Sequence, residues 1–374
     1  MVPLARRNLL YDRTRFFVTI GGITFAIVLV VVQLGLFLGF TATTSGVIDH
    51  SGADLWITAR GVQYFEVGFP ISERAVYRVL SDPGVTRAGK YIVQFSAWKR
   101  PDGARKNIEV IGFDPNGGMG GPWNIVAGRV ENLRQRNTVM LDEFYRTELG
   151  VRSIGDRVEI NGVSARIAGF TRGIRSFTTT PFVFTSFENA IGYTGSRSGE
   201  TVFVLVRAAA GARVDELKRR IAGRVPEFDV YTRDEFGVRT RNYWLFTTGA
   251  GIALLVAATL GLVVGTAVVA QTMYATTVDH ERDYGTLKAI GASNGYLCAT
   301  ILKQASLCAV AGYATGMAVS LAVARLSQAS GALILVPWQI AAAMFCLALM
   351  MCCGASLISL HRVWRLEPAC VFKE

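Results

Sequence analysis

The chain has 374 residues, of which 51% are hydrophobic and only 18% are charged, and its formal net charge is +11. Soluble domains carry about 25% charged residues, so this composition excludes a soluble enzyme of ordinary type and indicates a membrane protein.

The first 16 residues carry a concentration of positive charge among leucine and phenylalanine side chains. Four arginines lie there, at Arg6, Arg7, Arg13 and Arg15. Residues 1–16 are predicted to form a cytoplasmic helix lying in the membrane interface. The alternative is that they act only as a positive-inside anchor.

Residues 17–41 are predicted to form the first transmembrane helix. The run from Phe17 to Phe40 is predominantly apolar and is well beyond the roughly 7 to 15 residues of a signal-peptide core. A retained span is therefore favoured over the alternative of a cleaved secretory signal.

Residues 42–241 are predicted to form a large extracytoplasmic α+β domain with two lobes. The segment 41–242 holds 28 of the 39 Lys and Arg residues and 22 of the 28 Asp and Glu residues. Its charges of both signs are interspersed, which favours a solvated surface near lipid headgroups over nucleic-acid binding. Helical spacing is seen in 72–80, with Ser72 as the expected cap, and in 215–225. Alternating apolar residues predict strands in 89–100, 106–113, 137–142, 156–170, 181–186 and 201–208.

Two local signals refine this domain. Asn161-Gly162 predicts a hairpin turn, whose inner face would be filled by Val158, Ile160, Val163, Ala165 and Ile167. Thr232 and Glu235 have the spacing of a capping box, so a helix is expected to start there and to continue into the membrane as a stalk. Capping-box spacings also arise by chance, and Gly237 weakens a continuous helix.

Residues 242–277 are predicted to form the second transmembrane helix. Tyr243–Val278 lacks charge and would be about 54 Å long as a helix, against a hydrocarbon core of about 30 Å. The remaining predicted segments are a cytoplasmic helix at 278–292, a third span at 296–325, a short external loop at 326–333, a fourth span at 334–360 and a cytoplasmic tail at 361–374. Both termini are predicted to be cytoplasmic, because the short flanks there carry the Lys and Arg residues.

Small residues recur at four-residue spacing in three of the spans. Such pairs allow helices to approach closely, either within one chain or between two copies. The predicted packing pairs are Gly35 and Gly39, Gly261 and Gly265, and Gly312 and Gly316.

Sequence signals for catalysis are absent. The chain has no GxxxxGK[ST] loop and no GxSxG turn, and His50, His280 and His361 lack metal-ligand spacing. No catalytic or metal site and no cofactor are therefore predicted. All six cysteines lie in the membrane section or the tail, so no disulfide is expected in the exported domain. The charge-free runs hold no ionisable group of the kind that marks an ion path, which argues against an ion-coupled carrier. A separate motor subunit docking on 279–290 is the predicted source of energy.

Several motifs together resemble the MacB/FtsX-like permeases of ABC transporters, including DevC-type exporters and the lipoprotein-releasing LolC/LolE proteins. "ARRNLLYDRTRFFVTIGGITFAI" looks like the opening of the family, "IEVIGFDP" and "GDRVEINGVSARIAGF" look like its extracytoplasmic core domain, and "HERDYGTLKAIGAS" is similar to its coupling helix. The resemblance implies an ATPase-coupling site formed by Glu281, Arg282, Asp283, Tyr284, Gly285, Leu287, Lys288, Ile290 and Gly291. His280, Asp283 and Tyr284 depart from the usual motif, which leaves the identity of the ATPase open.

The resemblance further implies four transmembrane helices in a dimeric permease of the bacterial inner membrane. Two ATPase subunits would bind ATP and magnesium, and their closure would move the exported domain, a mechanism called mechanotransmission. The favoured role is export of a lipid, glycolipid, peptide or drug through a periplasmic adaptor and a TolC-like outer-membrane duct. The alternatives are an FtsX-like mechanical regulator of a cell-wall hydrolase and a lipoprotein-releasing permease.

Overall fold

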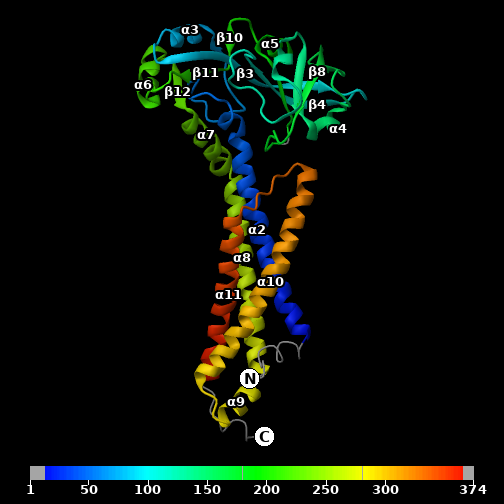
Figure 1. Cartoon of the computed structure of the whole chain (residues 1–374), viewed down its shortest axis with the longest axis vertical. Helices are drawn as coiled ribbons and strands as arrows, with labels where there is room; N and C mark the ends of the chain where they lie inside the picture. Colours follow the sequence, from blue (N-terminus) through cyan, green and yellow to red (C-terminus); the bar gives the residue numbers. More distant parts are fainter. Residues whose placement is uncertain (1–12, 179, 280, 365–374) are drawn as a thin grey trace. The chain divides into compact units, whose positions relative to one another are not determined.

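The computed structural model describes residues 13–178, 180–279 and 281–364 and divides the chain into two compact units (Figure 1). We call residues 40–251 the core domain, and we call residues up to 39 together with those from 252 onward the membrane unit. Most of the predicted interfacial helix (1–12), His280 and the end of the tail (365–374) lie outside the described residues.

The core domain is an α+β unit, as the alternating sequence patterns predicted. Its elements in chain order are β1 (Leu55–Ala59), β2 (Ile71–Ser72), α3 (Arg74–Leu80), β3 (Val85–Lys99), β4 (Arg105–Phe113), β5 (Ile125–Gly128), η1 (Val130–Arg134), β6 (Thr138–Asp142), η2 (Glu143–Tyr145), α4 (Arg146–Leu149), β7 (Arg157–Ile160), β8 (Val163–Thr171), β9 (Phe182–Ser186), α5 (Phe187–Thr194), β10 (Glu200–Thr201), β11 (Phe203–Ala208), α6 (Val214–Arg224), β12 (Phe228–Thr232), α7 (Arg233–Asn242) and the π-helical turn η3 (Tyr243–Thr247).

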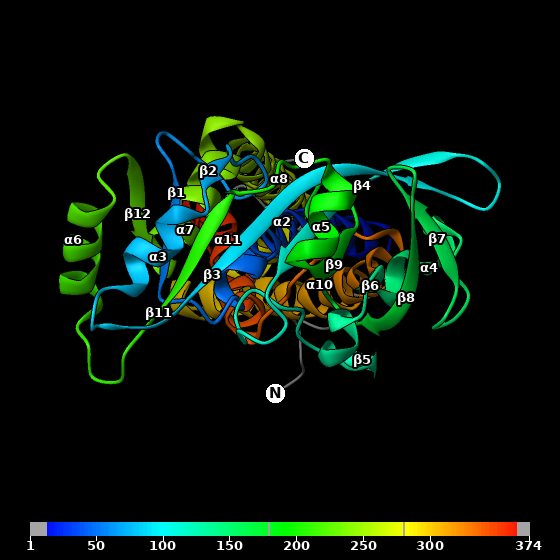
Figure 2. The ribbon, with the colours of Figure 1, turned by 90° about the horizontal axis from the view of Figure 1, so that it is seen from above.

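One ten-stranded mixed sheet organises the core domain. Its order is β12-β1-β11-β3-β4-β9-β6-β8-β5, with β7 paired to β3 and β8, while β2 and β10 form a separate pair. The long strand β3 changes partner midway: Val85–Tyr91 pair with β11, and Ile92–Lys99 pair with β4. Figure 2 shows β3 crossing the domain between α3 and α5. The strand therefore joins the two halves of the domain into one sheet.

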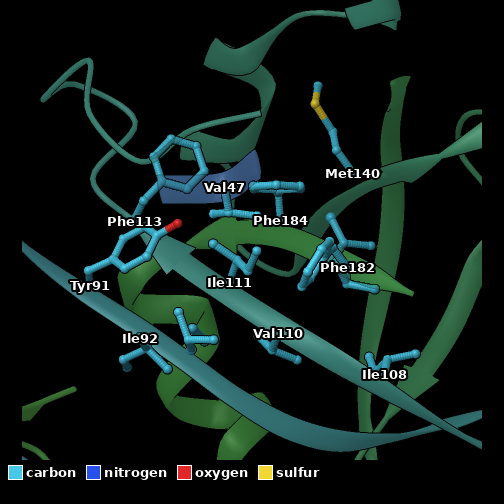
Figure 3. Packing of buried hydrophobic residues seen from close by; sticks show 14 of the residues in the cluster. Val47, Tyr91, Ile92, Ile108, Val110, Ile111, Phe113, Met140, Phe182 and Phe184 are labelled. Carbon is cyan, nitrogen blue, oxygen red and sulfur yellow. The ribbon is translucent and has the colours of Figure 1, made fainter. Parts of the chain in front are cut away.

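Two hydrophobic clusters fill this domain, where two lobes were predicted. The larger lies around β3, β4, β6, β8 and β9 and includes Val110, Phe113 and Phe184 (Figure 3). The smaller lies between the sheet and α3 and α6. In β1, Leu55 packs into the smaller cluster while Trp56 packs into the larger, because successive residues of a strand point to opposite faces. The two halves are thus two cores on one continuous sheet.

The predicted hairpin at Asn161-Gly162 is confirmed. Both residues have positive φ, 50° and 80°, and Ile160 pairs with Val163 across the turn. These are the left-handed conformations that a tight two-residue turn requires. Ile160, Ala165 and Ile167 are buried, while Val158 and Val163 are partly buried against the larger cluster.

Helix α3 begins later than predicted. Ser72 is not its cap, because Ser72 lies in β2 and pairs with Glu200 of β10. The cap position is held by Glu73, and the Arg74 amide donates to the Ser72 hydroxyl at 3.3 Å.

Helix α2 (Arg13–Asp49) continues eight residues beyond the predicted end of the first span at 41. Thr44 does not interrupt it, because its hydroxyl donates to the Phe40 carbonyl within the helix, at 2.6 Å. Val47 and Ile48 belong to the larger cluster of the core domain. The last turns of α2 are therefore part of the core domain rather than a polar exit from the membrane.

Within the described residues, four helices are long and apolar enough to cross a membrane, in agreement with the predicted fold class. Besides α2 they are α8 (Ala250–Asp279), α10 (Asn294–Ser330) and α11 (Trp338–Trp364), and α9 (Glu281–Ala289) lies between α8 and α10 (Figure 1). Helix α10 extends five residues past the predicted 325 and ends at Ser330, and Gly331 follows as its cap with a φ of 90°. The following loop therefore comes later than the predicted 326–333, and α11 begins just after Pro337.

The capping box is present, but the predicted continuous stalk is wrong. The Glu235 amide donates to the Thr232 hydroxyl at 3.2 Å, and the Thr232 amide donates to the Glu235 carboxylate at 2.8 Å. Helix α7 then ends at Asn242, continues as the π-helical turn η3, and stops before Gly249, whose φ is 80°. Helix α8 starts only at Ala250, eight residues after the predicted 242, because a left-handed residue cannot continue a right-handed helix.

Candidate functional site

The short helix α9 and the turn after it form a defined structural motif. The Ile290 amide donates to the Thr286 carbonyl, the Gly291 amide to Lys288, and the Ala292 amide to Leu287, at 3.1, 3.0 and 2.9 Å. Gly291 has a φ of 100°, which glycine adopts without steric cost. This pattern ends α9 as a Schellman-type turn does and explains why glycine follows "LKAI" in the sequence.

The turn leads directly into α10, whose start is also fixed. Ser293 occupies the cap position, and its hydroxyl accepts the Tyr296 amide at 3.2 Å. Leu287 of α9 packs against Leu297 and Ile301, both buried, near the start of α10. Apolar packing therefore holds α9 against α10, and local hydrogen bonds fix the turn between them.

The predicted coupling residues separate into two groups by burial. Gly285 is buried, Leu287 and Lys288 are partly buried, and Gly291 is exposed. Ile290 is 80% exposed, more than any other large apolar side chain among the described residues. The resemblance implied the same coupling role for Leu287 and Ile290, but Leu287 packs inside the chain and Ile290 faces outward.

The first turn of α9 carries the remaining predicted coupling residues. Glu281, Arg282, Asp283 and Tyr284 lie within the helix, so their backbone positions follow on from α8. This turn concentrates three charged residues between two apolar membrane helices.

The six predicted packing glycines all lie at close contacts inside the membrane unit. A Cβ atom added at Gly261 would stand 2.1 Å from the Leu29 side chain, and one at Gly265 would stand 2.1 Å from Ala26 Cβ. Helix α8 therefore approaches α2 so closely that these positions have no room for a side chain.

The other four glycines show the same property. Gly312 and Gly316 of α10 face Ile23 and Ile27 of α2, where an added Cβ would stand 2.5 and 2.9 Å from them. Gly35 and Gly39 face the loop after α10, and Gly39 has the closest contact, 1.7 Å from an added Cβ to the Leu333 carbonyl oxygen. The Leu335 amide donates to the Gly35 carbonyl at 3.1 Å. Glycine contacts thus bind α2 to its neighbours within one chain.

Sequence reasoning missed two buried carboxyl groups in the core domain, Glu66 and Glu109. Both lie among large apolar side chains, and both have raised pKa values because burial disfavours their charged forms. Glu109 carries a sequence signal, since it stands inside the apolar strand "NIEVIGF" that is buried on both faces. Glu66 lies in a loop after β1 and has no comparable signal.

Comparison with known proteins assigns both parts of the chain. Residues 16–224 match the family model of the MacB-like periplasmic core domain, and residues 243–368 match that of the FtsX-like permease C-terminal region. A first domain of the periplasmic core type followed by a permease region of three membrane helices defines a multi-pass transporter permease. The chain belongs to the MacB/FtsX-type permeases of ABC transporters, and membership in this family implies an ATPase partner.

Full-length relatives agree with this assignment. The ABC transporter permeases Rv2563 of Mycobacterium tuberculosis and Mb2592 of Mycobacterium bovis are each 24% identical over 377 residues, covering 100% of this chain and 99% of the relative. Among solved structures, the periplasmic region of MacB from Actinobacillus actinomycetemcomitans matches 49% of this chain and 91% of its own, at 10% identity and a TM-score of 0.38.

Proposed function

We propose that this protein is the permease subunit of an ABC exporter that works by mechanotransmission. ATP binding and hydrolysis, with magnesium, take place in two separate ATPase subunits that dock on α9 from the cytoplasm. Their closure displaces α9, and the connected membrane helices move the core domain on the other side of the membrane. The observation that carries this proposal is the largely exposed Ile290 on a short, braced helix between two membrane helices.

The bracing of α9 supports its role as the point where force enters. Leu287 packs on Leu297 and Ile301, and the Gly291 turn and the Ser293 cap leave only a short link to α10. A displacement of α9 would therefore be passed to α10 rather than absorbed by a loose loop. An exposed apolar side chain on a helix whose sequence also carries charged residues suits a small protein interface, which has an apolar centre and a polar rim.

The close packing of the membrane helices favours a mechanism in which these helices move rather than one in which cargo passes between them. Gly261, Gly265, Gly312 and Gly316 bring α8 and α10 so close to α2 that a methyl group would not fit. The charge-free spans also lack the ionisable groups that line ion paths. We therefore propose that the cargo, a lipid, glycolipid, peptide or drug, is handled by the extracytoplasmic domain with an adaptor and an outer-membrane duct. A second permease copy and cytoplasmic termini complete the proposed assembly.

The docking role is tested by Ile290→Asp in the complex copurified with its native ATPase and reconstituted in nanodiscs. A charge at the centre of the interface is expected to cost at least about 2 kcal/mol of binding, about a thirtyfold loss of affinity. ATPase stimulation by the permease should fall accordingly. Leu287→Asp is a poorer test than Ile290→Asp, because that change would also break the contact with α10.

The matched control is Ile154→Asp, which places the same change on an exposed isoleucine of the core domain. This control should leave ATPase stimulation and complex recovery unchanged. Docking through α9 is refuted if Ile290→Asp retains full stimulation while folding normally.

A further inference from the structure

Glu66 and Glu109 are both buried carboxyl groups, and among the described residues no basic side chain forms an ion pair with either of them. Glu109 on β4 is 0% exposed, and neither of its carboxyl oxygens has a hydrogen-bond partner. Glu66 is 4% exposed, and its Oε2 accepts a hydrogen bond from the indole Nε1–H of Trp244 at 3.1 Å. Unpaired charges are very costly in such surroundings, so the neutral, protonated forms are favoured.

Asp142 shows how the same domain accommodates a buried carboxyl group that has a structural role. It accepts the Ile174 and Phe144 amides at 2.8 and 3.1 Å and the Thr171 hydroxyl at 3.3 Å. Its pKa is raised by burial, but these three donors act against the rise. Glu109 has no such donor, and Glu66 has only the Trp244 indole and its own backbone amide. Neither glutamate therefore has the ordinary role of a turn or cap residue, in which the side chain accepts amides of neighbouring residues.

Aromatic side chains cover the Glu66 site. Tyr64 stacks on Tyr243 with ring centroids 4.0 Å apart, and Trp244 contacts Tyr64 and Phe177 at 5.2 and 4.4 Å. Tyr243 and Trp244 are the first two residues of the π-helical turn η3. The hydrogen bond to Glu66 therefore fixes the turn that directly precedes Gly249 and α8.

The tyrosines around the pair are themselves neutral in the physiological range. Burial raises the pKa of Tyr91 on β3 well above its ordinary value, with the charge of Glu109 adding to the rise, and Tyr91 donates to the Gly120 carbonyl at 3.3 Å. The pKa of Tyr64 is raised by burial and by Tyr243 and Glu66. These phenols offer no positive charge to stabilise a carboxylate.

The basic residues of the elements packed nearby are engaged elsewhere. On α7, Arg239 donates to the Val62 carbonyl at 3.0 Å, and Arg241 pairs with Asp49 at 3.6 Å. On α6, Lys218 pairs with Glu235 at 2.6 Å. No cation contributes to the raised pKa values of Glu66 and Glu109, whose principal cause is burial.

We propose that Glu66 and Glu109 form a proton-operated latch that holds the η3 turn. While both carboxyl groups are protonated, Glu66 anchors Trp244 and the aromatic cover stays closed. When Glu66 loses its proton to bulk water, the carboxylate keeps the Trp244 indole and its own backbone amide as donors, but it stays buried beside an acidic neighbour and needs water to become stable. Tyr243 lines a groove of about 610 Å³ together with Gln63 and Thr247. Water can reach the Glu66 carboxylate from this groove when the rings of Tyr64 and Tyr243 separate.

The two members of the latch have different roles. Burial raises the pKa of Glu66 to about 7, and the Trp244 hydrogen bond opposes this rise. Burial raises the pKa of Glu109 well above its ordinary value, and the charge of Glu66 raises it further. Glu66 is therefore the group that releases its proton first, and Glu109 is the neutral neighbour that then resists losing its own. The latch depends only on the core domain and not on the proposed ATPase docking.

The latch is tested by ¹⁹F NMR of the full chain in nanodiscs labelled with 5-fluorotryptophan. The signal of Trp244 is assigned by its loss in Trp244→Phe. In the wild type this signal should shift between about pH 5.5 and about pH 8.5 with a midpoint near 7. The shift should be absent in Glu66→Gln and preserved in Glu109→Gln. Glu188→Gln removes an exposed carboxyl group and should match the wild type.

Infrared difference spectra supply a second measurement that does not depend on Trp244. The wild type should lose one protonated-carboxyl band over the same pH range, and Glu66→Gln should not. The proposal is overturned if the Trp244 signal is constant with pH in the wild type, if it shifts equally in Glu66→Gln, or if no such band is lost.

Discussion

The core domain and the membrane unit depend on opposite kinds of residue for their internal packing. The larger cluster of the core domain is built from large side chains such as Trp56, Phe113 and Phe184, whose burial removes apolar surface from water. The membrane unit instead places glycines where α8, α10 and the loop after α10 meet α2. Lipid tails are as apolar as the helices, so close packing rather than removal from water favours helix association.

This difference teaches where each region tolerates change. The core domain loses stability when a large residue is made smaller, whereas the membrane unit loses stability when a small residue is made larger. The acidic and basic residues follow the same division, since the charge-free runs hold no Asp, Glu, Lys or Arg while the core domain buries Glu66 and Glu109.

The largest expected effect comes from making a buried aromatic residue smaller. Phe184 lies in β9 and is 1% exposed (Figure 3), so Phe184→Ala should lower the free energy of unfolding of the core domain by about 4 kcal/mol. Denaturant unfolding of the full chain in detergent, followed by tryptophan fluorescence, measures this change. Phe69→Ala, at a site that is 57% exposed, is the matched control and should cost well under 1 kcal/mol. Equal losses in the two variants would contradict the comparison.

The complementary change enlarges a glycine of the membrane unit. Gly39→Ala places a methyl carbon 1.7 Å from the Leu333 carbonyl oxygen, which is backbone and cannot rotate away, so we expect a loss of about 3 kcal/mol. Gly21→Ala is the control on the same helix, because nothing lies within 4 Å of its added Cβ, and it should be neutral or slightly stabilising. Thermal unfolding of both variants in one detergent tests the pair. A stable Gly39→Ala protein would show that this contact does not hold α2.

These contrasts also explain what the sequence could predict. Long apolar runs located the four spans, and alternating apolar residues located most strands, because each signal depends on residues close together in the chain. The GxxxG spacing located the tight contacts, but not whether they lie within a chain, since that depends on which helix lies opposite. The extension of α2 to Asp49 was missed because Val47 and Ile48 are stabilised by residues far away in the sequence.

The candidate site was predictable to a similar degree. The motif located α9 and its terminal glycine, because a left-handed turn has a local sequence requirement. It could not distinguish Leu287 from Ile290, since both are apolar and only the position of α10 decides which one is buried. The break between η3 and α8 was likewise hidden, because an uncharged run from Tyr243 to Val278 also fits a single long helix.

The smallest of the three expected effects concerns the buried carboxyl group of Glu66. This group is an exception in the core domain, whose interior is otherwise built mainly from large apolar side chains. Its pKa is about 7 in the folded protein, because of burial, against 4.5 for an ordinary glutamate. The folded state therefore holds its proton more tightly than the unfolded state, so this contribution to stability is complete below about pH 4.5 and is lost as the pH rises toward 7. Between about pH 5.5 and about pH 8 the free energy of unfolding should fall by about 2 kcal/mol from this group.

Denaturant unfolding of the core domain at these two pH values, in the wild type and in Glu66→Gln, isolates the contribution of Glu66. Other titrating groups affect both proteins, so the difference between their pH dependences reports Glu66 alone. Glu66→Gln should lose about 2 kcal/mol less than the wild type over this range, because its amide has no proton to release. Parallel pH dependences would mean that Glu66 is already ionised in the folded domain, and the core domain would then bury a carboxylate with Trp244 as its hydrogen-bonding side chain.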